Sequence, residues 1–393
     1  MSKINQILDT QQSTVRTIFV SSYIPRKCGL ATFTKDLTNA LNDLNSESLA
    51  EIIAINDGEI DLEYPWEVKY KIHQHKYDSY YQAAEYVNQS SADVVCLQHE
   101  FGLFGGKAGE HIFAFLRNIN KPIVTIFHTI LAKPTDIQRS TLQRLGEISD
   151  SVVAMIPDAK ERLERDYGID RDKVVIIHHG VSDQKKAQST NNNLNWGDSP
   201  ILLMSGLISK NKGIEYVIEA LPEIVKKFPN LLLVVAGQTH PSVLKNEGEK
   251  YRTNLKNLAK SLNVQKNVKF INKYLELQDL LKLYEKSDIY LTPHLDPQQI
   301  TSGTLAYALG MGKACISTGY PYAKEMLANN RGIIVDFKNS QQIADAVIKI
   351  LQDPILRAKL EDGAYVLGRK MRWPRVAERY LNLFRYISLK NQE

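Results

Sequence analysis

Short apolar runs rich in β-branched residues alternate along the chain with longer stretches whose apolar positions recur every three or four residues. The short runs have the length of buried strands, and the longer stretches have the period of amphipathic helices. This alternation predicts an α/β protein with parallel sheets covered by helices. Expected helices include 33–44 and 158–167, and the expected strands are 17–22, 52–56, 94–97, 123–127, 152–155, 174–177, 201–204, 231–236, 268–271, 289–291, 314–317 and 333–336.

A polar, asparagine-rich segment separates the two halves of this pattern. Residues 184–199 (QKKAQSTNNNLNWGDS) show no apolar period and are typical of an interdomain linker. A chain of 393 residues has room for two α/β domains. We therefore expect two doubly wound, Rossmann-like domains over 1–183 and 200–370, facing one another across a cleft.

The composition is that of a soluble globular protein, with 43% apolar and 24% charged residues. The net charge of +5 is mild and forms no single basic stripe, which disfavours nucleic-acid binding. Basic residues in 256–286 and 369–375 are typical of solvated helix faces, with peripheral contact to an anionic membrane surface as the alternative. Three dispersed cysteines and the lack of an 18-residue apolar stretch predict a cytoplasmic protein, peripheral to the inner face of the membrane if it contacts one.

Ligands of doubly wound sheets bind beyond the carboxyl ends of the strands, so the loops there are the candidates for chemistry. In the first half, Gly29 follows the first strand and allows close approach of a ligand. The glycine-rich loop 98–106 joins His99 and Glu100 to Phe101, a polar pair beside a ring that suits a sugar. His128 ends the next strand. Ordinary glycine turns and a buried polar pair remain the structural alternatives.

In the second half, two loops have the features of an anion site. Gly206 provides the turn after a strand, and Lys212 stands just before a helix, where a cation opposes the helix dipole unless an anion joins it. Thr301, Ser302, Gly303 and Thr304 then open a helix with hydroxyls and successive N–H groups. A D-x-D pattern, Asp170 to Asp172, lies in a turn where aspartate is ordinary, so no metal site is expected.

With these residues in view, the chain resembles the retaining glycosyltransferase family 4, which has the GT-B fold, over nearly its whole length. The resemblance rests on the segments PRKCGLATF, IFHT, HHGV, SGLISKNKG, the Thr-Ser-Gly loop with LAYALGMGKACIST, and RWPRVAERYLNLF. It implies a C-terminal helix within 371–393 that crosses back to the first domain. It also implies retention of anomeric configuration by front-face displacement, with no bound metal or cofactor and a nucleotide-diphosphate sugar as co-substrate.

The resemblance also implies roles for the candidate residues. Gly29 would approach the donor phosphates and His128 the transferred sugar. Lys212 would neutralise the leaving diphosphate, and residues 301–304, with Gly206, would bind diphosphate and sugar. The acceptor, a carbohydrate or glycoconjugate, would lie against the loop that carries His99, Glu100 and Phe101.

Three positions depart from the family pattern. The family usually has two glutamates eight residues apart, where this chain has Gln299 and Tyr307. The usual arginine five residues before the lysine is Leu207. Gln299 can still hydrogen-bond sugar hydroxyls, without the strength that a carboxylate adds.

The leading hypothesis is a hexosyltransferase, mannosyl or glucosyl, in glycan or glycoconjugate synthesis. Because both glutamates are replaced, a non-catalytic GT-B protein that binds a nucleotide or a glycan is the first alternative. Another GT-B enzyme, such as an epimerase or a phosphorylase, is the second. The retained His128 and Lys212 favour the transferase.

Overall fold

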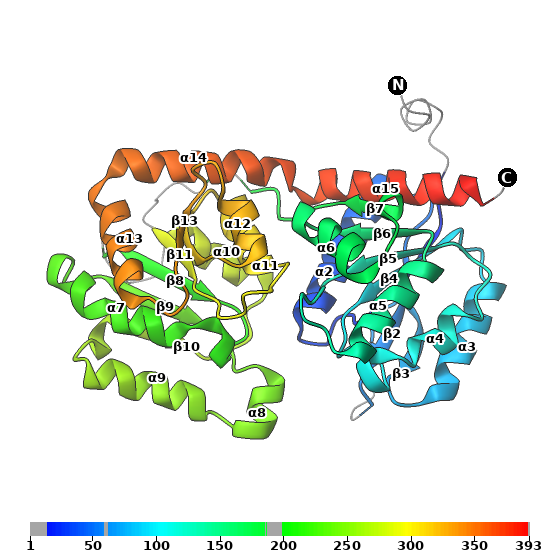
Figure 1. The fold of residues 1–393 in the computed structure, drawn as a ribbon, viewed down its shortest axis with the longest axis horizontal. Coiled ribbons are helices and arrows are strands. Elements are labelled where there is room, and N and C mark those ends of the chain that lie inside the picture. The colour runs from blue at the N-terminus through cyan, green and yellow to red at the C-terminus, as the bar shows by residue number, and fades with distance from the viewer. Residues whose placement is uncertain (1–13, 59–61, 185, 187–198, 392–393) are drawn as a thin grey trace. The chain divides into compact units, whose positions relative to one another are not determined.

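The computed structural model describes residues 14–58, 62–184, 186 and 199–391. It divides into two compact units (Figure 1): Met1–Gly180 with Trp373–Glu393 form unit 1, and Val181–Arg372 form unit 2. Most of the expected linker 184–199 lies outside the described residues. Each unit is a parallel sheet with helices, which confirms the predicted fold class of two Rossmann-like domains.

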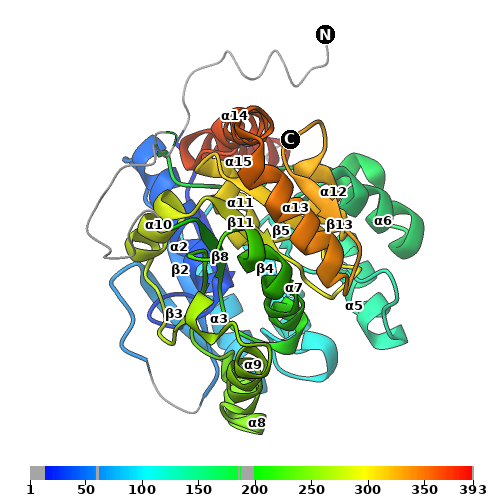
Figure 2. The same cartoon turned by 90° about the vertical axis from the view of Figure 1, so that its left-hand side faces the viewer.

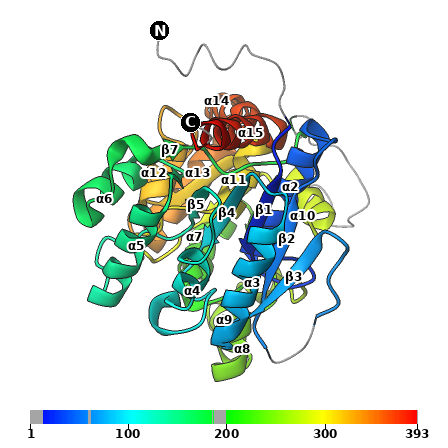
Figure 3. The same ribbon diagram turned by 90° about the vertical axis from the view of Figure 1, so that its right-hand side faces the viewer.

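In the described part of unit 1, seven strands form one parallel sheet in the order β3-β2-β1-β4-β5-β6-β7. Figure 3 shows β3, β2, β1, β4 and β5 following one another in this order. The inner strands β1 and β4 are buried along their whole length, which is why they are apolar runs without alternation. The strand order reverses between β1 and β4, the usual place for a ligand. The strands are β1 Thr17–Ser21, β2 Glu51–Asn56, β3 Val68–His73, β4 Val94–His99, β5 Ile123–Phe127, β6 Ser151–Ala154 and β7 Val174–Ile176.

Strand β3 was not expected from the sequence. Its residues, VKYKIH, alternate polar and apolar side chains and are mostly half-exposed, because β3 pairs only with β2 at the sheet edge. The register between β2 and β3 also shifts at Ile52/Ile53. The sequence pattern of buried strands therefore does not apply to this edge.

The helices of unit 1 include one contributed by the far end of the chain. Helix α15 packs against α2, and its Trp373, Tyr380 and Phe384 belong to the same core as β1 and β4. The helices are α2 Gly29–Leu44, α3 Tyr77–Gln89, α4 Ile112–Leu116, α5 Asp136–Ile148, α6 Pro157–Tyr167 and α15 Trp373–Lys390, with 3-10 helices η1 Lys107–Gly109 and η2 Arg171–Lys173.

In the described part of unit 2, six strands form a parallel sheet in the order β10-β9-β8-β11-β12-β13, which reverses between β8 and β11. The strands are β8 Ile201–Ser205, β9 Leu232–Ala236, β10 Val268–Ile271, β11 Ile289–Thr292, β12 Ala314–Thr318 and β13 Ile333–Val335. Figure 2 shows α7 beside α13, and both contribute to the unit's core. The helices are α7 Ile214–Lys227, α8 Pro241–Glu247, α9 Lys250–Ser261, α10 Leu277–Lys286, α11 Gly303–Gly310, α12 Pro321–Leu327, α13 Ser340–Gln352 and α14 Pro354–Lys370, with η3 Lys210–Lys212 and η4 Gln265–Asn267.

None of the helices in the described part of the chain combines the length and the apolar character that a membrane span requires.

Candidate active site

The loops that follow β8 and β11 are joined closely at the reversal point of the second sheet. Gly213 has a left-handed φ of 62°, and a Cβ there would lie 2.2 Å from the carbonyl oxygen of Pro293. The N–H of Leu295 donates to the carbonyl of Asn211 at 2.9 Å. These contacts bring Lys212 Nζ to 3.3 Å from Nε2 of His294.

Lys212 is a half-buried cation without a described counterion. No described carboxylate pairs with it, and desolvation lowers the pKa of its ammonium to about 8. A desolvated ammonium gains from a nearby anion far more than an exposed one does. Lys212 is therefore suited to bind a phosphate group.

The start of α11 is a second candidate for binding an anion. Ser302 is its N-cap, and its Oγ accepts from the N–H of Leu305 at 3.4 Å. The N–H groups of Gly303 and Thr304 cannot bond within the helix and are available to an anion. Gly206, with φ 113°, lies against this turn, since a Cβ there would be 3.4 Å from Cγ2 of Thr304. The structure thus brings Gly206 and the 301–304 turn together at the carboxyl ends of the central strands β8 and β11.

Gln299 is bound within the protein at both ends of its amide. Its Oε1 lies 3.0 Å from Nδ1 of His294, and its Nε2 donates to the carbonyl of Thr301 at 2.8 Å. Each end keeps one further hydrogen-bonding position. The second replaced glutamate, Tyr307, lies buried in α11.

In unit 1, a chain of hydrogen bonds crosses the reversal point between β1 and β4. His128 Nε2 lies 3.0 Å from Oε1 of Gln98, whose Nε2 donates to Oγ1 of Thr34 at 3.0 Å, and Thr34 bonds Ser21. Thr34 Oγ1 donates its proton to the carbonyl of Leu30 at 2.8 Å, so it accepts from the amide nitrogen of Gln98. The amide oxygen of Gln98 then accepts from His128, which places that ring's proton on Nε2. Burial lowers the pKa of His128 to about 3, with His179 and His99 adding to the shift. His128 is therefore a neutral ring.

Gly29 is exposed and begins α2, four residues before the helix start that the sequence suggested. The helix extends back because Cys28 is its N-cap, with Sγ accepting from the N–H of Ala31 at 3.4 Å. A thiol is a weak acceptor and no standard cap signal. A Cβ added at Gly29 would meet no atom within 4 Å, so the protein leaves this position open to a ligand.

The three residues predicted to contact the acceptor differ in their exposure to solvent. His99 is fully buried, edge-on to Phe101 and Phe127, with neither ring nitrogen hydrogen-bonded, and burial lowers its pKa to about 3. Glu100 and Phe101 are half-exposed. Glu100 accepts from Thr129 Oγ1 at 2.6 Å, while burial raises the pKa of its carboxyl group. In this structure the loop presents Glu100 and Phe101, and His99 lies beneath them.

The D-x-D pattern has a local structural role. Oδ1 of Asp170 accepts from the N–H of Asp172 at 2.9 Å and so begins the short helix η2. Over the described residues, no three His, Cys, Asp or Glu side chains gather as a metal site.

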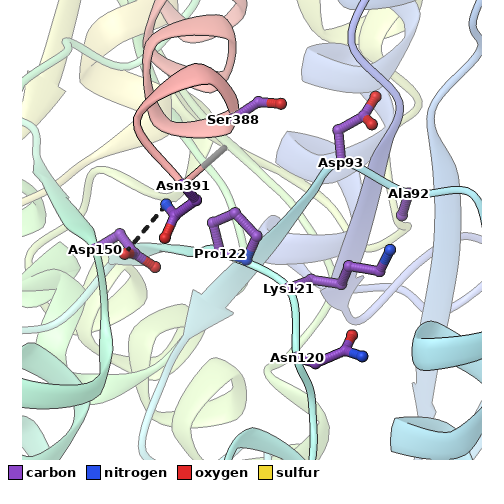
Figure 4. Close-up of a pocket in the computed structure, with 8 residues that line it drawn as sticks. All are labelled: Ala92, Asp93, Asn120, Lys121, Pro122, Asp150, Ser388 and Asn391. Atoms are coloured by element: carbon purple, nitrogen blue, oxygen red, sulfur yellow. Dashed lines mark hydrogen bonds between the residues drawn. The ribbon is translucent and has the colours of Figure 1, made fainter. Parts of the chain in front are cut away.

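A polar pocket of about 370 Å³ lies near the amino ends of β4, β5 and β6 and the end of α15 (Figure 4). Its carboxylates hold strand starts: Asp93 accepts from the N–H of Arg16, and Asp150 from that of Ile123, each at 2.8 Å. Figure 4 also shows the amide of Asn391 directed at Asp150. This pocket lies at the amino ends of the strands of unit 1, whereas Gly29, Glu100 and His128 follow the carboxyl ends. We therefore do not assign it to the site.

Two residues of the site were missed in the sequence. Gln98, fully buried in β4, holds His128, and His294, two residues after the end of β11, holds Lys212. Both are polar residues at the carboxyl end of an apolar run. That position was the available signal, but nothing local indicates which distant side chain each one meets.

Two family models account for most of the chain. The model described as "Glycosyltransferase Family 4" matches residues 29–185, and the model described as "Glycosyl transferases group 1" matches residues 185–366. The chain belongs to glycosyltransferase family 4.

This family 4 member is similar to an uncharacterized glycosyltransferase of Methanocaldococcus jannaschii, 25% identical over 60% of each chain. It is also similar to a GDP-mannose-dependent monoacylated alpha-(1-6)-phosphatidylinositol monomannoside mannosyltransferase of Corynebacterium glutamicum, 25% identical over 47% of each chain. The matches thus span 60% and 47% of the lengths of these relatives. The structure of Anabaena HepE in complex with UDP-glucose superposes with a TM-score of 0.73 at 14% identity, over 94% of this chain and 99% of that one. Such a likeness indicates the shared GT-B fold.

Proposed function

We propose that this protein transfers a hexosyl group, mannosyl or glucosyl, from a nucleotide-diphosphate sugar to an acceptor hydroxyl with retention of anomeric configuration. The acceptor class is a glycan or glycoconjugate. The observation that carries this proposal is that a desolvated ammonium, Lys212, is linked through His294 and Gln299 to Thr301, just before the capped N-terminus of α11, at the reversal point of the second sheet.

The proposed chemistry follows from where charge develops. As the bond between the sugar and the diphosphate breaks, negative charge grows on the phosphate oxygens. The Lys212 ammonium and the N–H groups of Gly303 and Thr304 would stabilise that charge without a bound metal ion. In unit 1, neutral His128 would contact the transferred sugar through Nδ1, since Nε2 is bonded to Gln98. The loop with Glu100 and Phe101 would contact the acceptor.

The relatives narrow the donors to test. The name of the Corynebacterium relative specifies GDP-mannose, and HepE was solved with UDP-glucose. We therefore propose a UDP- or GDP-hexose as donor.

The test is a thermal-shift screen of UDP, GDP, UDP-glucose and GDP-mannose, followed by measurement of donor hydrolysis and transfer. A donor held at a hundred times its Kd stabilises a protein by about 2.7 kcal/mol. We expect either the uridine or the guanosine nucleotides to shift the unfolding midpoint, and the matching nucleotide sugar to be consumed. The rate of its consumption should be the same with and without EDTA. Loss of turnover in EDTA and its return with manganese would contradict the metal-free mechanism.

A non-catalytic binding role is the second candidate, favoured by the two replaced glutamates and by the internal bonds of Gln299. Nucleotide binding without consumption of any sugar donor, across a panel of acceptors, would support this role over transfer.

A further inference from the structure

His294 is a rigidly held ring. It is 3% exposed and stacks on Tyr320, with ring centroids 5.4 Å apart and planes at 13°. Its carbonyl accepts from Oγ1 of Thr318 at 2.5 Å. Lys212, by contrast, reaches the site through a flexible four-carbon stem, and fixing such a side chain costs rotamer entropy. A rigid partner therefore determines where the ammonium rests.

Gln299 determines which nitrogen of His294 carries the proton. The carbonyl of Thr301 can only accept, so the amide nitrogen of Gln299 must face it, at 2.8 Å. The amide oxygen then faces Nδ1 of His294 at 3.0 Å and accepts from it. The proton of the neutral ring lies on Nδ1, which leaves a lone pair on Nε2.

That lone pair faces Lys212. An ammonium group only donates, so the 3.3 Å separation from Nζ to Nε2 is a hydrogen bond from lysine to histidine. Burial and the Lys212 charge lower the pKa of His294 well below its ordinary value, which keeps the ring neutral and able to accept.

We propose that His294 is the positioning residue for Lys212, and that Gln299 fixes the histidine tautomer that accepts the lysine proton while tying the pair to the 301–304 turn. This inference rests on the proposed function and assigns a role to a residue outside the family's usual glutamate pattern. It also gives Gln299 a task different from binding the sugar. A glutamate at position 299 would favour a protonated His294, whose Nε2–H would oppose the ammonium.

Two substitutions of His294 test the roles of its two ring nitrogens separately. In His294→Gln, the amide oxygen can take the place of Nε2 and accept from Lys212. In His294→Asn, the amide nitrogen takes the place of Nδ1 and keeps the bond to Gln299, but Lys212 loses its acceptor. Removing a preorganised donor of this kind typically lowers kcat by about 10²–10³. Because Lys212 is displaced and not deleted, we expect His294→Asn to lower kcat at least tenfold with KM changed less, and His294→Gln to retain most of kcat.

Gln299→Glu tests the tautomer. We expect this variant to lose turnover, whereas a sugar-binding role for position 299 predicts equal or higher turnover. Nitrogen NMR of His294 in the free protein adds a readout independent of activity. It should show Nδ1 protonated and Nε2 unprotonated in the wild type, and a doubly protonated ring near neutral pH in Gln299→Glu.

The outcomes distinguish this inference from the proposed function. If the wild type consumes no sugar donor, the proposed function fails. The positioning role can then still be tested by the affinities of the His294 variants for UDP and GDP and by the tautomer of His294 that NMR reports. A proton on Nε2, or equal effects of His294→Asn and His294→Gln at matched unfolding midpoints, would overturn the positioning role. So would a gain of turnover in Gln299→Glu.

Discussion

A methyl group added at Gly29 would have no other protein atom within 4 Å. We expect Gly29→Ala to change the free energy of unfolding by less than about 0.5 kcal/mol, because exposed substitutions seldom do more. A ligand phosphate approaching this turn would meet the methyl group, so turnover should fall at least about tenfold, which is roughly 1.4 kcal/mol. Urea unfolding and steady-state kinetics measure the two effects. Unchanged turnover would show that no ligand approaches Gly29.

The ammonium of Lys212 has its pKa lowered to about 8 by desolvation. Only the protonated form attracts a diphosphate, so affinity for UDP or GDP should be highest below pH 8 and fall as the pH rises toward 9.5. The phosphate groups of the nucleotide are already fully ionised there, since the second pKa of a phosphate monoester is about 6. Calorimetry above pH 8 should also detect proton uptake on binding.

Lys212→Arg is the matched control, because arginine stays protonated throughout this range. The affinity of this variant for UDP or GDP should not change with pH over this range, even if it is lower than that of the wild type. A wild-type profile as flat as that of the arginine variant would mean that Lys212 does not contact the phosphates.

At the scale of an element, the N-terminus of α11 combines a structural cap with the proposed anion site. Ser302→Asn and Ser302→Asp both retain an N-cap and have nearly the same size. We expect similar unfolding midpoints for the two. The aspartate adds a charge that repels the diphosphate by as much as about 4 kcal/mol at 4 Å and an effective dielectric of 20. Nucleotide affinity of Ser302→Asp should therefore be at least about tenfold below that of Ser302→Asn, and equal affinities would place the phosphates elsewhere.

At the scale of the whole molecule, the last described helix completes the core of the first unit. Phe384 of α15 is fully buried and edge-on to Phe19 of β1, with ring centroids 6.0 Å apart. Phe384→Ala should lower the free energy of unfolding by about 3–5 kcal/mol, the usual range for a core phenylalanine. Leu389→Ala, at a position 45% exposed, is the control from the same helix and should change it little. Chemical denaturation monitored by circular dichroism compares them, and equal effects would contradict this packing.

Local patterns in the sequence were sufficient for much of this architecture. The apolar runs of β1, β4 and β8 identify central strands, because burial on both faces removes polar residues from them. Since ligands of such sheets bind at the carboxyl ends of strands, the loops with Gly29, Lys212 and 301–304 could be chosen as candidates without a structure. The two-domain α/β fold follows from the same alternation. The edge strand β3 did not follow, because its half-exposed residues lack that pattern.

Only the tertiary structure decided which of these residues meet. Lys212 and His294 are 82 residues apart, and their contact depends on β8 and β11 pairing at the reversal of the sheet. The burial of His99 beneath its loop, the bonds of Gln299 and the packing of α15 on α2 depend likewise on distant partners. The hydrophobic period depends only on residues a few positions apart. It therefore predicts helices, strands and their buried faces. The protonation state and direction of a site residue depend on side chains brought near by folding, and no local pattern contains them.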